Sequence, residues 1–465
     1  MRVGGEASWP AGPTSLRSRA FRAGSLALVG HFSNLMLRFI ATVILTRIFS
    51  PDAFGILAVI MSVQVVIALL TDIGLHQAVI QSKNGSDPAL LNTAFTLQIG
   101  RGFFIWLLTL GLAGGLSVAI KYELVPGHSV YSNPQLPLYL GVVSLSAAIS
   151  GFQSMKAITA GRNLQLGRLL VIELVTQLLG LVFIISIARI TESLWSYIFG
   201  MLLSAAIAVF LSHVVLNGHP DRPGWSRDAA KELFQFGRWT FLSSFLSAFA
   251  ANGDRLLFGV WFTPQLLGLY SIAYNLATVP EGLVNRVFGT VSFPALSEAA
   301  RVQPRRFPEI YFRMRWITDS ALLFLAGFLF SAGSMIVSII YDARYTEAGW
   351  MLEYLSFGLI FVRYGLSQNA YLALGRPDYV SILSLAKLIS LFSFASIFFY
   401  LFGVKGAVLG VAFHMLPTSL CTFYFNRKHG LNSLRLEICV LATWIFGWLV
   451  GVGCSAIQSY AVKFI

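Results

Sequence analysis

The sequence predicts an all-α polytopic membrane protein made of two repeated six-helix lobes around a central cavity, and three observations support this fold class. Hydrophobic residues make up 56% of the 465 residues and charged residues only 11%, a composition too apolar for a water-exposed surface. Apolar runs long enough to cross a bilayer recur along the whole chain. Short sequence patterns also recur in the two halves at a nearly constant offset.

The membrane-crossing segments that we expect number six in each half, with one more at the end, about 13 in total. In the first half they are 24–48, 54–75, 91–119, 136–158, 164–188 and 193–216. In the second half they are 237–261, 265–293, 316–340, 349–373, 379–402 and 406–426. The last segment, 437–460, has few flanking charges, so the sequence leaves open whether it crosses fully.

The distribution of basic residues predicts the orientation, because Lys and Arg accumulate in cytoplasmic connections. With the N-terminus inside, the inner connections hold twenty of the 33 Lys and Arg and the outer ones hold six. Arg315 is counted among the inner ones, and Lys387 lies within a segment. We therefore expect a cytoplasmic N-terminus.

Three pairs of patterns support an internal repeat. They are Phe49-Ser50-Pro51 with Gly55 and Phe262-Thr263-Pro264 with Gly268; Phe21 with Gly24 and Phe234 with Gly237; and Gly161-Arg162 and Gly375-Arg376, separated by 213, 213 and 214 residues. Six segments per half is an even number, so both halves start from the same side of the membrane. The expected division is a basic N-terminus at 1–22, an N-lobe at 23–217, a linker at 218–235, a C-lobe at 236–426 and a C-terminal part at 427–465.

Several classes of function have no support in the sequence. The net charge of +13 is scattered between apolar runs rather than gathered on one domain, which argues against nucleic-acid binding. The cysteines and histidines lack metal-ligand spacing, and neither a phosphate-binding glycine loop nor a Ser-His-Asp signature is present. We therefore expect no enzyme activity, no metal and no cofactor, with transport driven by a Na⁺ or H⁺ gradient, by cargo consumption or by concentration alone.

Three stretches resemble the Wzx-like oligosaccharide flippases, a family of polysaccharide biosynthesis proteins. They are Leu-Thr-Arg-Ile-Phe-Ser-Pro-Asp-Ala-Phe-Gly from Leu45 to Gly55 with Asp72-Ile73-Gly74-Leu75; Asp254 to Gly259 with Leu267 to Tyr274; and Phe293-Pro294-Ala295-Leu296-Ser297. The resemblance extends over about residues 20 to 430. It places the chain in the multidrug/oligosaccharidyl-lipid/polysaccharide exporter superfamily, whose members have two six-helix lobes and work by alternating access.

The resemblance also implies a function. The cargo would be an undecaprenyl-diphosphate-linked oligosaccharide repeat unit, moved from the cytoplasmic to the periplasmic leaflet of a bacterial inner membrane for lipopolysaccharide, capsule or exopolysaccharide assembly. Partners would be membrane lipid and other assembly proteins, such as a polymerase and a chain-length regulator.

Intramembrane polar residues are the candidate site residues, because an ionisable group in lipid is costly and tends to face a cavity or a partner. For the diphosphate these are Arg38, Arg101, Arg255, Arg286 and Arg363, with Arg38 and Arg255 first, because guanidinium groups bind phosphate oxygens in forked pairs. Asn34 is a candidate sugar contact. The alternatives are pairing between helices or snorkelling to the interface, which suits Arg101 well.

Asp72, Asp254 and Glu281 are candidates for binding a coupling ion, and the alternative is that they are counter-ions for the arginines. Asp254 is adjacent to Arg255, but neighbouring helix residues point about 100° apart, so we expect different partners for them. Pro280 predicts a kink beside Glu281.

Two other functions remain open at this point. A multidrug or metabolite antiporter of the same superfamily would have a smaller cavity and a clear ion-binding carboxylate. A membrane polymerase or ligase would act on the same lipid-linked sugars, but the longest outer connection, about 121–135, offers only Glu123 and His128 for acid–base chemistry.

Overall fold

The computed structural model describes residues 16–72, 74–82, 84–162, 165–191, 193–287 and 292–463, without the side chains of 16–28, 31, 235–243, 286–287 and 461–463. In these residues all regular structure is helical. The first half contains α1 Leu16–Ile48, α2 Pro51–Leu70, α3 Leu75–Gln81, α4 Pro88–Lys121, η1 Val130–Ser132, α5 Leu136–Ser150, α6 Lys156–Arg162, α7 Leu166–Thr191 and α8 Leu194–Val214.

The second half begins with one long helix and ends with another. Its elements are α9 Arg227–Trp261, α10 Pro264–Val287, α11 Phe293–Val302, η3 Pro304–Arg306, α12 Phe307–Ile340, η4 Ala343–Tyr345, α13 Ala348–Ser356, α14 Gly358–Val362, α15 Gly365–Ala373, α16 Pro377–Phe413, α17 Leu416–Lys428 and α18 Leu434–Lys463. Several helices begin with proline, which suits a first turn because its missing N–H has no helical partner there. Gly403, at φ 63°, breaks α16.

Within the described residues, seven helical stretches are long and apolar enough to cross a membrane. They are Pro51–Leu70, Pro88–Lys121, Leu166–Thr191, Leu194–Val214, Pro304–Ile340, Pro377–Lys428 and Leu434–Tyr460. The other expected segments also fall on helices, but some are interrupted: 349–373 is divided into α13, α14 and α15. The expected count of 13 crossings remains a prediction.

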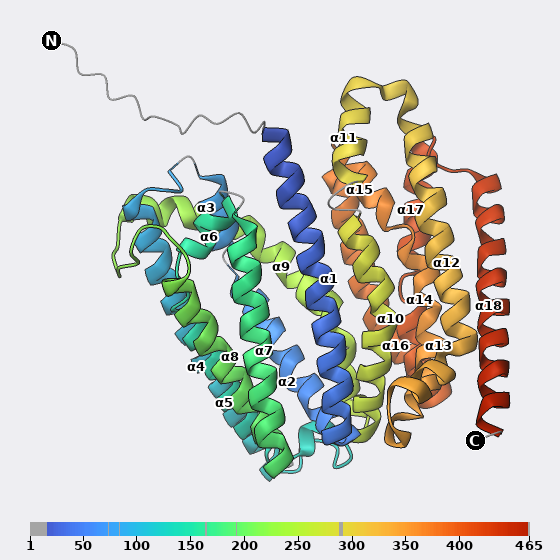
Figure 1. Cartoon of the computed structure of the whole chain (residues 1–465), viewed down its shortest axis with the longest axis horizontal. Coiled ribbons are helices and arrows are strands. Elements are labelled where there is room, and N and C mark those ends of the chain that lie inside the picture. The colour runs from blue at the N-terminus through green and yellow to red at the C-terminus, as the bar shows by residue number, and fades with distance from the viewer. Residues whose placement is uncertain are drawn as a thin grey trace.

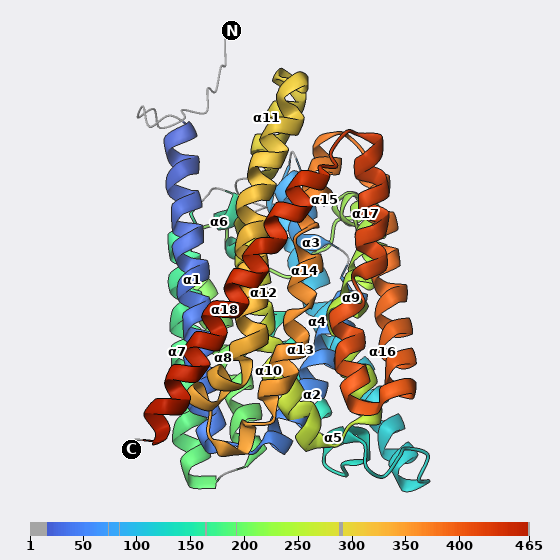
Figure 2. The same cartoon turned by 90° about the vertical axis from the view of Figure 1, so that its right-hand side faces the viewer.

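The helices form two lobes that converge at one end of the bundle (Figure 1). The N-lobe comprises α1 to α8, and the C-lobe comprises the second part of α9 with α10 to α17. Helix α9 starts against α3 and α4 and ends against α2 and α16. We call the end that carries α11 and the start of α1 the α11 end. The opposite end, where α1 finishes, is the η4 end (Figures 1 and 2).

The lobes meet where the repeated pattern recurs, because α2 packs along α10 at the η4 end. A Cβ atom on Gly55 would lie 1.9 Å from the Pro264 carbonyl oxygen, and one on Gly268 would lie 1.8 Å from the Pro51 carbonyl oxygen. Only glycine permits such a close approach of two backbones. The two copies of the Pro…Gly pattern therefore contact each other. The repeated glycine is needed in both halves because it lets the two helices approach closely.

Two further contacts hold the lobes together at the η4 end. Tyr345 of the C-lobe donates a hydrogen bond of 2.8 Å to the carbonyl of Phe49 at the end of α1. Tyr131 of the N-lobe donates one of 3.0 Å to the carbonyl of Leu256 on α9. The two tyrosines lie on η1 and η4, each of which follows the third expected membrane segment of its half. We call this pair of contacts the tyrosine clasps.

Helix α18 lies outside the repeat but is packed along α12 (Figure 2). A Cβ atom on Gly327 would lie 2.1 Å from the Trp444 carbonyl oxygen, and one on Gly447 would lie 2.0 Å from that of Phe324. Ser331 of α12 also donates a 3.0 Å hydrogen bond to the carbonyl of Trp448. The last helix is thus an integral part of the C-lobe.

Candidate functional site

A polar cavity of about 390 Å³ opens on the C-lobe side of the molecule. Its walls come from α9, α10, α14, α15, α16 and α17 and the connections between them. The lining residues are Leu246, Ser247, Ala250, Ala251, Glu281, Asn285, Val362, Gly365, Gln368, Asn369, Leu383, Ser384, Lys387, Met415 and Thr418. Its volume lies within the range of ordinary small-ligand pockets, so it can hold a polar head group but not a long apolar chain as well.

Of the cavity side chains within the described residues, Lys387 from α16 is positive and Glu281 from α10 is negative. Asn285, Gln368 and Asn369 add amides that can donate and accept hydrogen bonds. Among the side chains that the structure describes, no arginine lines this cavity. An ammonium group beside several amides can bind a phosphate and sugar hydroxyls together.

A break between α14 and α15 and a proline within α10 lie in this part of the wall. Pro280 lies inside α10, next to Glu281, and removes a backbone hydrogen bond there. The α14 helix ends at Val362 and α15 restarts at Gly365, so the chain turns at Arg363 and Tyr364. The cavity residues Val362 and Gly365 therefore lie on either side of the break between α14 and α15.

Arg255 lies one helical turn beyond the cavity residue Ala251 on α9. Its guanidinium carbon is 4.3 Å from the ring centroid of Tyr274, a cation–π contact. Asp254 is buried and accepts a hydrogen bond from Tyr270. The adjacent charges therefore have different partners, as the sequence predicted.

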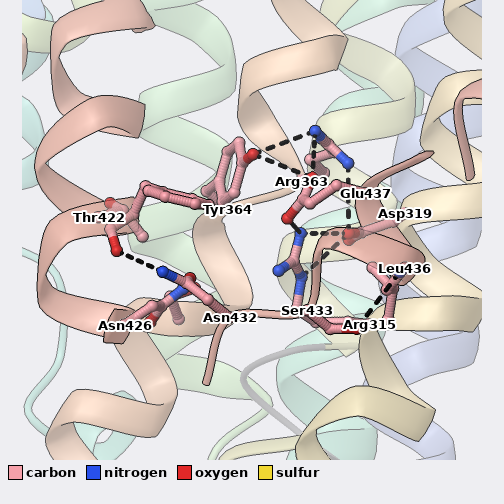
Figure 3. A network of polar contacts seen from close by, with 12 residues as sticks. Arg315, Asp319, Arg363, Tyr364, Thr422, Asn426, Asn432, Ser433, Leu436 and Glu437 are labelled. Carbon is pink, nitrogen blue, oxygen red and sulfur yellow. Dashed lines mark hydrogen bonds and ion pairs between the residues drawn. The ribbon is translucent and has the colours of Figure 1, made fainter. Parts of the chain in front are cut away.

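Arg363 belongs to a ring of four alternating charges (Figure 3). Arg315 lies 2.6 Å from Asp319 and 2.9 Å from Glu437, while Arg363 lies 2.7 Å from Glu437 and 3.7 Å from Asp319. Arg315 and Asp319 are fully buried. The Tyr364 hydroxyl adds a bond to Glu437. We call these four residues the charge ring.

A second polar cluster braces α15 a turn further along. Tyr311 of α12 and Ser367 share a 2.7 Å hydrogen bond. Asn426 of α17 donates to both of them and accepts a 2.7 Å bond from Tyr371. The segment that presents Gln368 and Asn369 to the cavity is thus held from its far side by two polar networks.

Arg101 and Asp72, expected as a phosphate contact and an ion site, lie together in the N-lobe. Their side chains are 3.8 Å apart, and Arg101 also donates a 2.6 Å hydrogen bond to the carbonyl of Ala68 near the end of α2. Asp72 accepts from the Gly74 amide. This pairing between helices matches the structural alternative for Arg101.

The candidates on α1 also lie away from the C-lobe cavity. Asn34 bonds to Glu173 and accepts a 2.8 Å bond from Gln177, both on α7. The Arg38 side chain is exposed. The Arg286 side chain lies outside the described residues.

Three residues that lie centrally in the structure were not among the candidates predicted from the sequence. Lys387 lines the cavity, Arg315 belongs to the buried charge ring and not to a connection, and Glu437 reaches the ring from α18. Lys387 had a usable signal, because a lysine deep in an apolar segment is as costly in lipid as an arginine.

One connection at the η4 end carries an ordered ion pair. Arg344 donates a 2.9 Å hydrogen bond to the carbonyl of Thr46 at the end of α1, and Asp342 holds the guanidinium in place at 2.6 Å. The hydrogen bond from the Arg344 side chain keeps the pKa of Asp342 below its ordinary value. This pair therefore stays charged at neutral pH.

Residues 44–349 match the family model described as "Polysaccharide biosynthesis protein". The lipopolysaccharide biosynthesis protein WzxC of Escherichia coli (strain K12) is 24% identical over 287 residues, which are 61% of this chain and 56% of that protein. The teichuronic acid biosynthesis protein TuaB of Bacillus subtilis (strain 168) is 20% identical over 318 residues, 67% of this chain and 62% of that protein. The chain therefore spans little more than half the length of these relatives.

Solved structures share the fold. The lipid II flippase MurJ, in an inward closed conformation, matches with a TM-score of 0.66 and 16% identity over 94% of this chain and 99% of that one. An inward-facing multidrug resistance MATE family transporter matches with a TM-score of 0.68 and 13% identity over 85% of this chain and 94% of that one. These likenesses show that the chain has the same helical fold as these two proteins.

Proposed function

Because this chain belongs to the family of polysaccharide biosynthesis proteins, we propose that it is a flippase for undecaprenyl-diphosphate-linked oligosaccharide repeat units. It is a multi-pass membrane protein with the fold of known transporters. The cargo moves from the cytoplasmic to the periplasmic leaflet, for assembly of lipopolysaccharide, capsule or exopolysaccharide. The polar C-lobe cavity carries this proposal.

The cavity suits the polar part of such a cargo. Lys387 supplies a positive charge for a phosphate oxygen, while Asn285, Gln368 and Asn369 suit sugar hydroxyls. A volume of about 390 Å³ accommodates only part of a lipid-linked repeat unit. The prenyl chain therefore stays in the bilayer, and the polar portion alone crosses between the lobes.

Sidedness follows from the exposed charges. Arg301, Arg305 and Arg306 are exposed at the α11 end, and Arg and Lys are enriched on the cytoplasmic side of membrane proteins. We therefore place the α11 end and the N-terminus in the cytoplasm, in a bacterial inner membrane. The Gly55–Gly268 contact and the tyrosine clasps then close the periplasmic side, and cargo enters from the α11 end.

Glu281 is the proposed coupling group, because it is the carboxylate in the cavity lining. A Na⁺ ion or a proton at this carboxylate changes the charge beside Lys387 and thereby cargo affinity. Arg255 is a secondary phosphate contact, one turn from Ala251. Arg38 meets the cargo on the N-lobe side.

A multidrug or metabolite antiporter is the second candidate. It is favoured by the likeness to a MATE family transporter, with a TM-score of 0.68, and by the small cavity with the Glu281 carboxylate in its lining. Such a protein would bind a soluble cation at Glu281, and polysaccharide assembly would not depend on it.

The deciding experiment measures lipid-linked oligosaccharide in a strain that lacks this protein. Spheroplasts are treated with a membrane-impermeant sugar-modifying reagent, and the strain is complemented with the wild-type protein or with Lys387→Gln. A flippase requires complete units that are protected on the cytoplasmic face and become accessible only with the wild-type protein. Accessible units in the deletion strain contradict the proposal and indicate a polymerase or ligase, and an unchanged pool favours the antiporter.

A further inference from the structure

The charge ring of Arg315, Asp319, Arg363 and Glu437 is the largest feature of the C-lobe that the proposed transport does not use. Its two cations and two anions alternate, and all four neighbouring pairs lie within 3.7 Å. The ring is neutral as a whole, so it can be buried in the bundle without a counter-ion. Loss of any one member leaves an uncompensated charge there.

The ring already contains buried polar atoms that lack hydrogen bonds. Within the described part of the chain, Asp319 Oδ1, Arg315 Nη1 and Arg363 Nη1 are buried without a hydrogen-bond partner. A remaining charge must therefore pull on its neighbours or draw water into the site, and both change the position of the backbone that carries it.

The backbone at Arg363 is also the wall of the cavity. Val362 on one side and Gly365 on the other line the cavity, and Gln368 and Asn369 follow within the next turn. Arg363 Nε donates a 3.0 Å bond to the carbonyl of Ile360, and this bond fixes the guanidinium relative to the end of α14. The segment around Arg363 therefore contributes to the charge ring through the Arg363 side chain and to the cavity wall through Val362 and Gly365.

Glu437 brings the last helix into this arrangement (Figure 3). It is the only ring member on α18, and the close approaches of Gly327 and Gly447 hold α18 against α12. Glu437 accepts from Arg363 and from Tyr364, the two residues at the break between α14 and α15. A helix outside the repeat therefore holds the bend that shapes the cavity.

We propose that the charge ring is the positioning element of the cavity, through which α18 sets how Gln368 and Asn369 face the cargo. The expected effect of the charge ring on transport rests on the proposed function. Its expected effect on the cavity wall does not, and it is measured without cargo. Neutrality of the ring is the property that matters, so removing one charge is more harmful than removing a balanced pair.

The test uses full-length protein in lipid nanodiscs. Cys421, Cys439 and Cys454 are replaced by alanine and a reporter thiol is placed in the wall by Asn369→Cys. The reaction rate of this thiol with a small maleimide is measured with the wild-type ring, with Glu437→Gln, and with Arg363→Gln plus Glu437→Gln. We expect a change of at least 5-fold for the single variant and a return to within 2-fold for the balanced double variant.

Transport is then compared for the same ring variants in cells with native Asn369, at equal protein abundance. We expect a higher half-saturating cargo level for Glu437→Gln and recovery in the double variant. Arg376→Gln, which breaks an exposed pair with Asp378, is the matched control and leaves both readouts unchanged. If Glu437→Gln accumulates poorly, Glu437→Asp is measured instead. It keeps the negative charge on a shorter side chain, so we expect a smaller change in thiol reactivity than for Glu437→Gln.

Equal thiol reactivity in the wild-type ring, Glu437→Gln and Glu437→Asp overturns the proposal. The proposal is also overturned if the double variant changes the thiol reactivity as much as the single variant does. Side-chain packing, and not the charge balance of the ring, would then set the position of the cavity wall. A thiol response without any flippase activity in the wild-type protein leaves the positioning role standing and rejects the proposed function instead.

Discussion

Gly55 and Gly268 occupy matching places in the two lobes and lie against each other's helix, each facing the carbonyl of the proline that begins the other copy of the pattern. The lobes therefore touch through backbone atoms at the η4 end. Any movement that opens this end must separate these two helices, and any side chain added at either glycine opposes closure.

Gly55→Val is expected to hold the η4 end open, because its Cβ would lie 1.9 Å from the Pro264 carbonyl oxygen. The measurement is labelling of a cavity cysteine, Ser247→Cys, by an impermeant maleimide added to the periplasmic side, in a background without native cysteines. Labelling should rise and transport should fall. Gly114→Val on α4 is the control, since nothing lies within 4 Å of its added Cβ; equal labelling in both variants would count against a gate at this contact.

Removing the clasp hydroxyls by Tyr131→Phe or Tyr345→Phe should weaken closure without blocking it. Each variant loses one hydrogen bond worth about 1 kcal/mol, roughly a 5-fold change in an equilibrium. Labelling of Ser247→Cys from the periplasmic side should rise in each single variant. In the double variant the rise should be about the product of the two single rises. Tyr400→Phe, on a side chain 90% exposed, serves as the control; no rise in either clasp variant would contradict a role in closure.

The pH dependence of closure should follow Asp342. Its pKa is lowered in the folded protein by the Arg344 hydrogen bond, so the contribution of the pair is present above the ordinary aspartate pKa of about 4 and is lost as the pH falls through the lower, folded value. At each pH, periplasmic labelling of Ser247→Cys is divided by labelling of the same thiol in the Gly55→Val background, because the reactive thiolate fraction itself falls with pH. This ratio should be flat from about pH 8 to 5 and rise only in stronger acid. Asp342→Asn should raise labelling at every pH and remove the acid response. A transition near neutral pH would be incompatible with this assignment.

Lys387→Gln is expected to reduce transport at least 10-fold at normal abundance, because it removes the positive charge from the cavity lining. Lys387→Arg should retain part of the activity, since it keeps the charge with a different shape. The readout is the amount of surface polysaccharide together with the protected lipid-linked pool. Arg38→Ala plus Arg255→Ala is measured in parallel; wild-type export in that double variant would reject both residues as phosphate contacts.

Arg101→Gln should lower stability and leave the transport rate per folded molecule nearly unchanged. It removes a charged hydrogen bond to Ala68 and the pairing with Asp72, a loss of about 1–3 kcal/mol. Thermal unfolding of the purified protein measures the first effect and transport normalised to folded protein measures the second. If the unfolding temperature is unchanged and transport is lost, Arg101 contacts the cargo after all.

The repeat shows how far sequence reasoning extended. The patterns at Pro51 and Pro264 predicted two related lobes, and the structure confirms two lobes and places the patterns in contact. The resemblance to polysaccharide biosynthesis proteins is also confirmed. The different partners of Asp254 and Arg255 could be predicted because they depend only on the angle between neighbouring helix residues.

The site residues were harder to predict for a physical reason. Arg363 and Lys387 look alike in the sequence, each a single cation in an apolar segment. Whether such a cation faces a cavity or a counter-ion depends on the rotation of its helix and on which helix lies beside it. The partners of Arg363 come from residues 319 and 437, far away along the chain.

The sequence by itself therefore determined that this protein lies in a membrane, that it is helical, that it contains a repeat and which family it belongs to. Hydropathy and short motifs determine these properties, and both can be read from residues that are neighbours in the chain. The tertiary structure alone decided which charges face the cavity, which neutralise one another in the ring, and that the last helix belongs to the C-lobe. Those properties depend on contacts between residues far apart in the chain, and a local pattern carries no information about its distant partners.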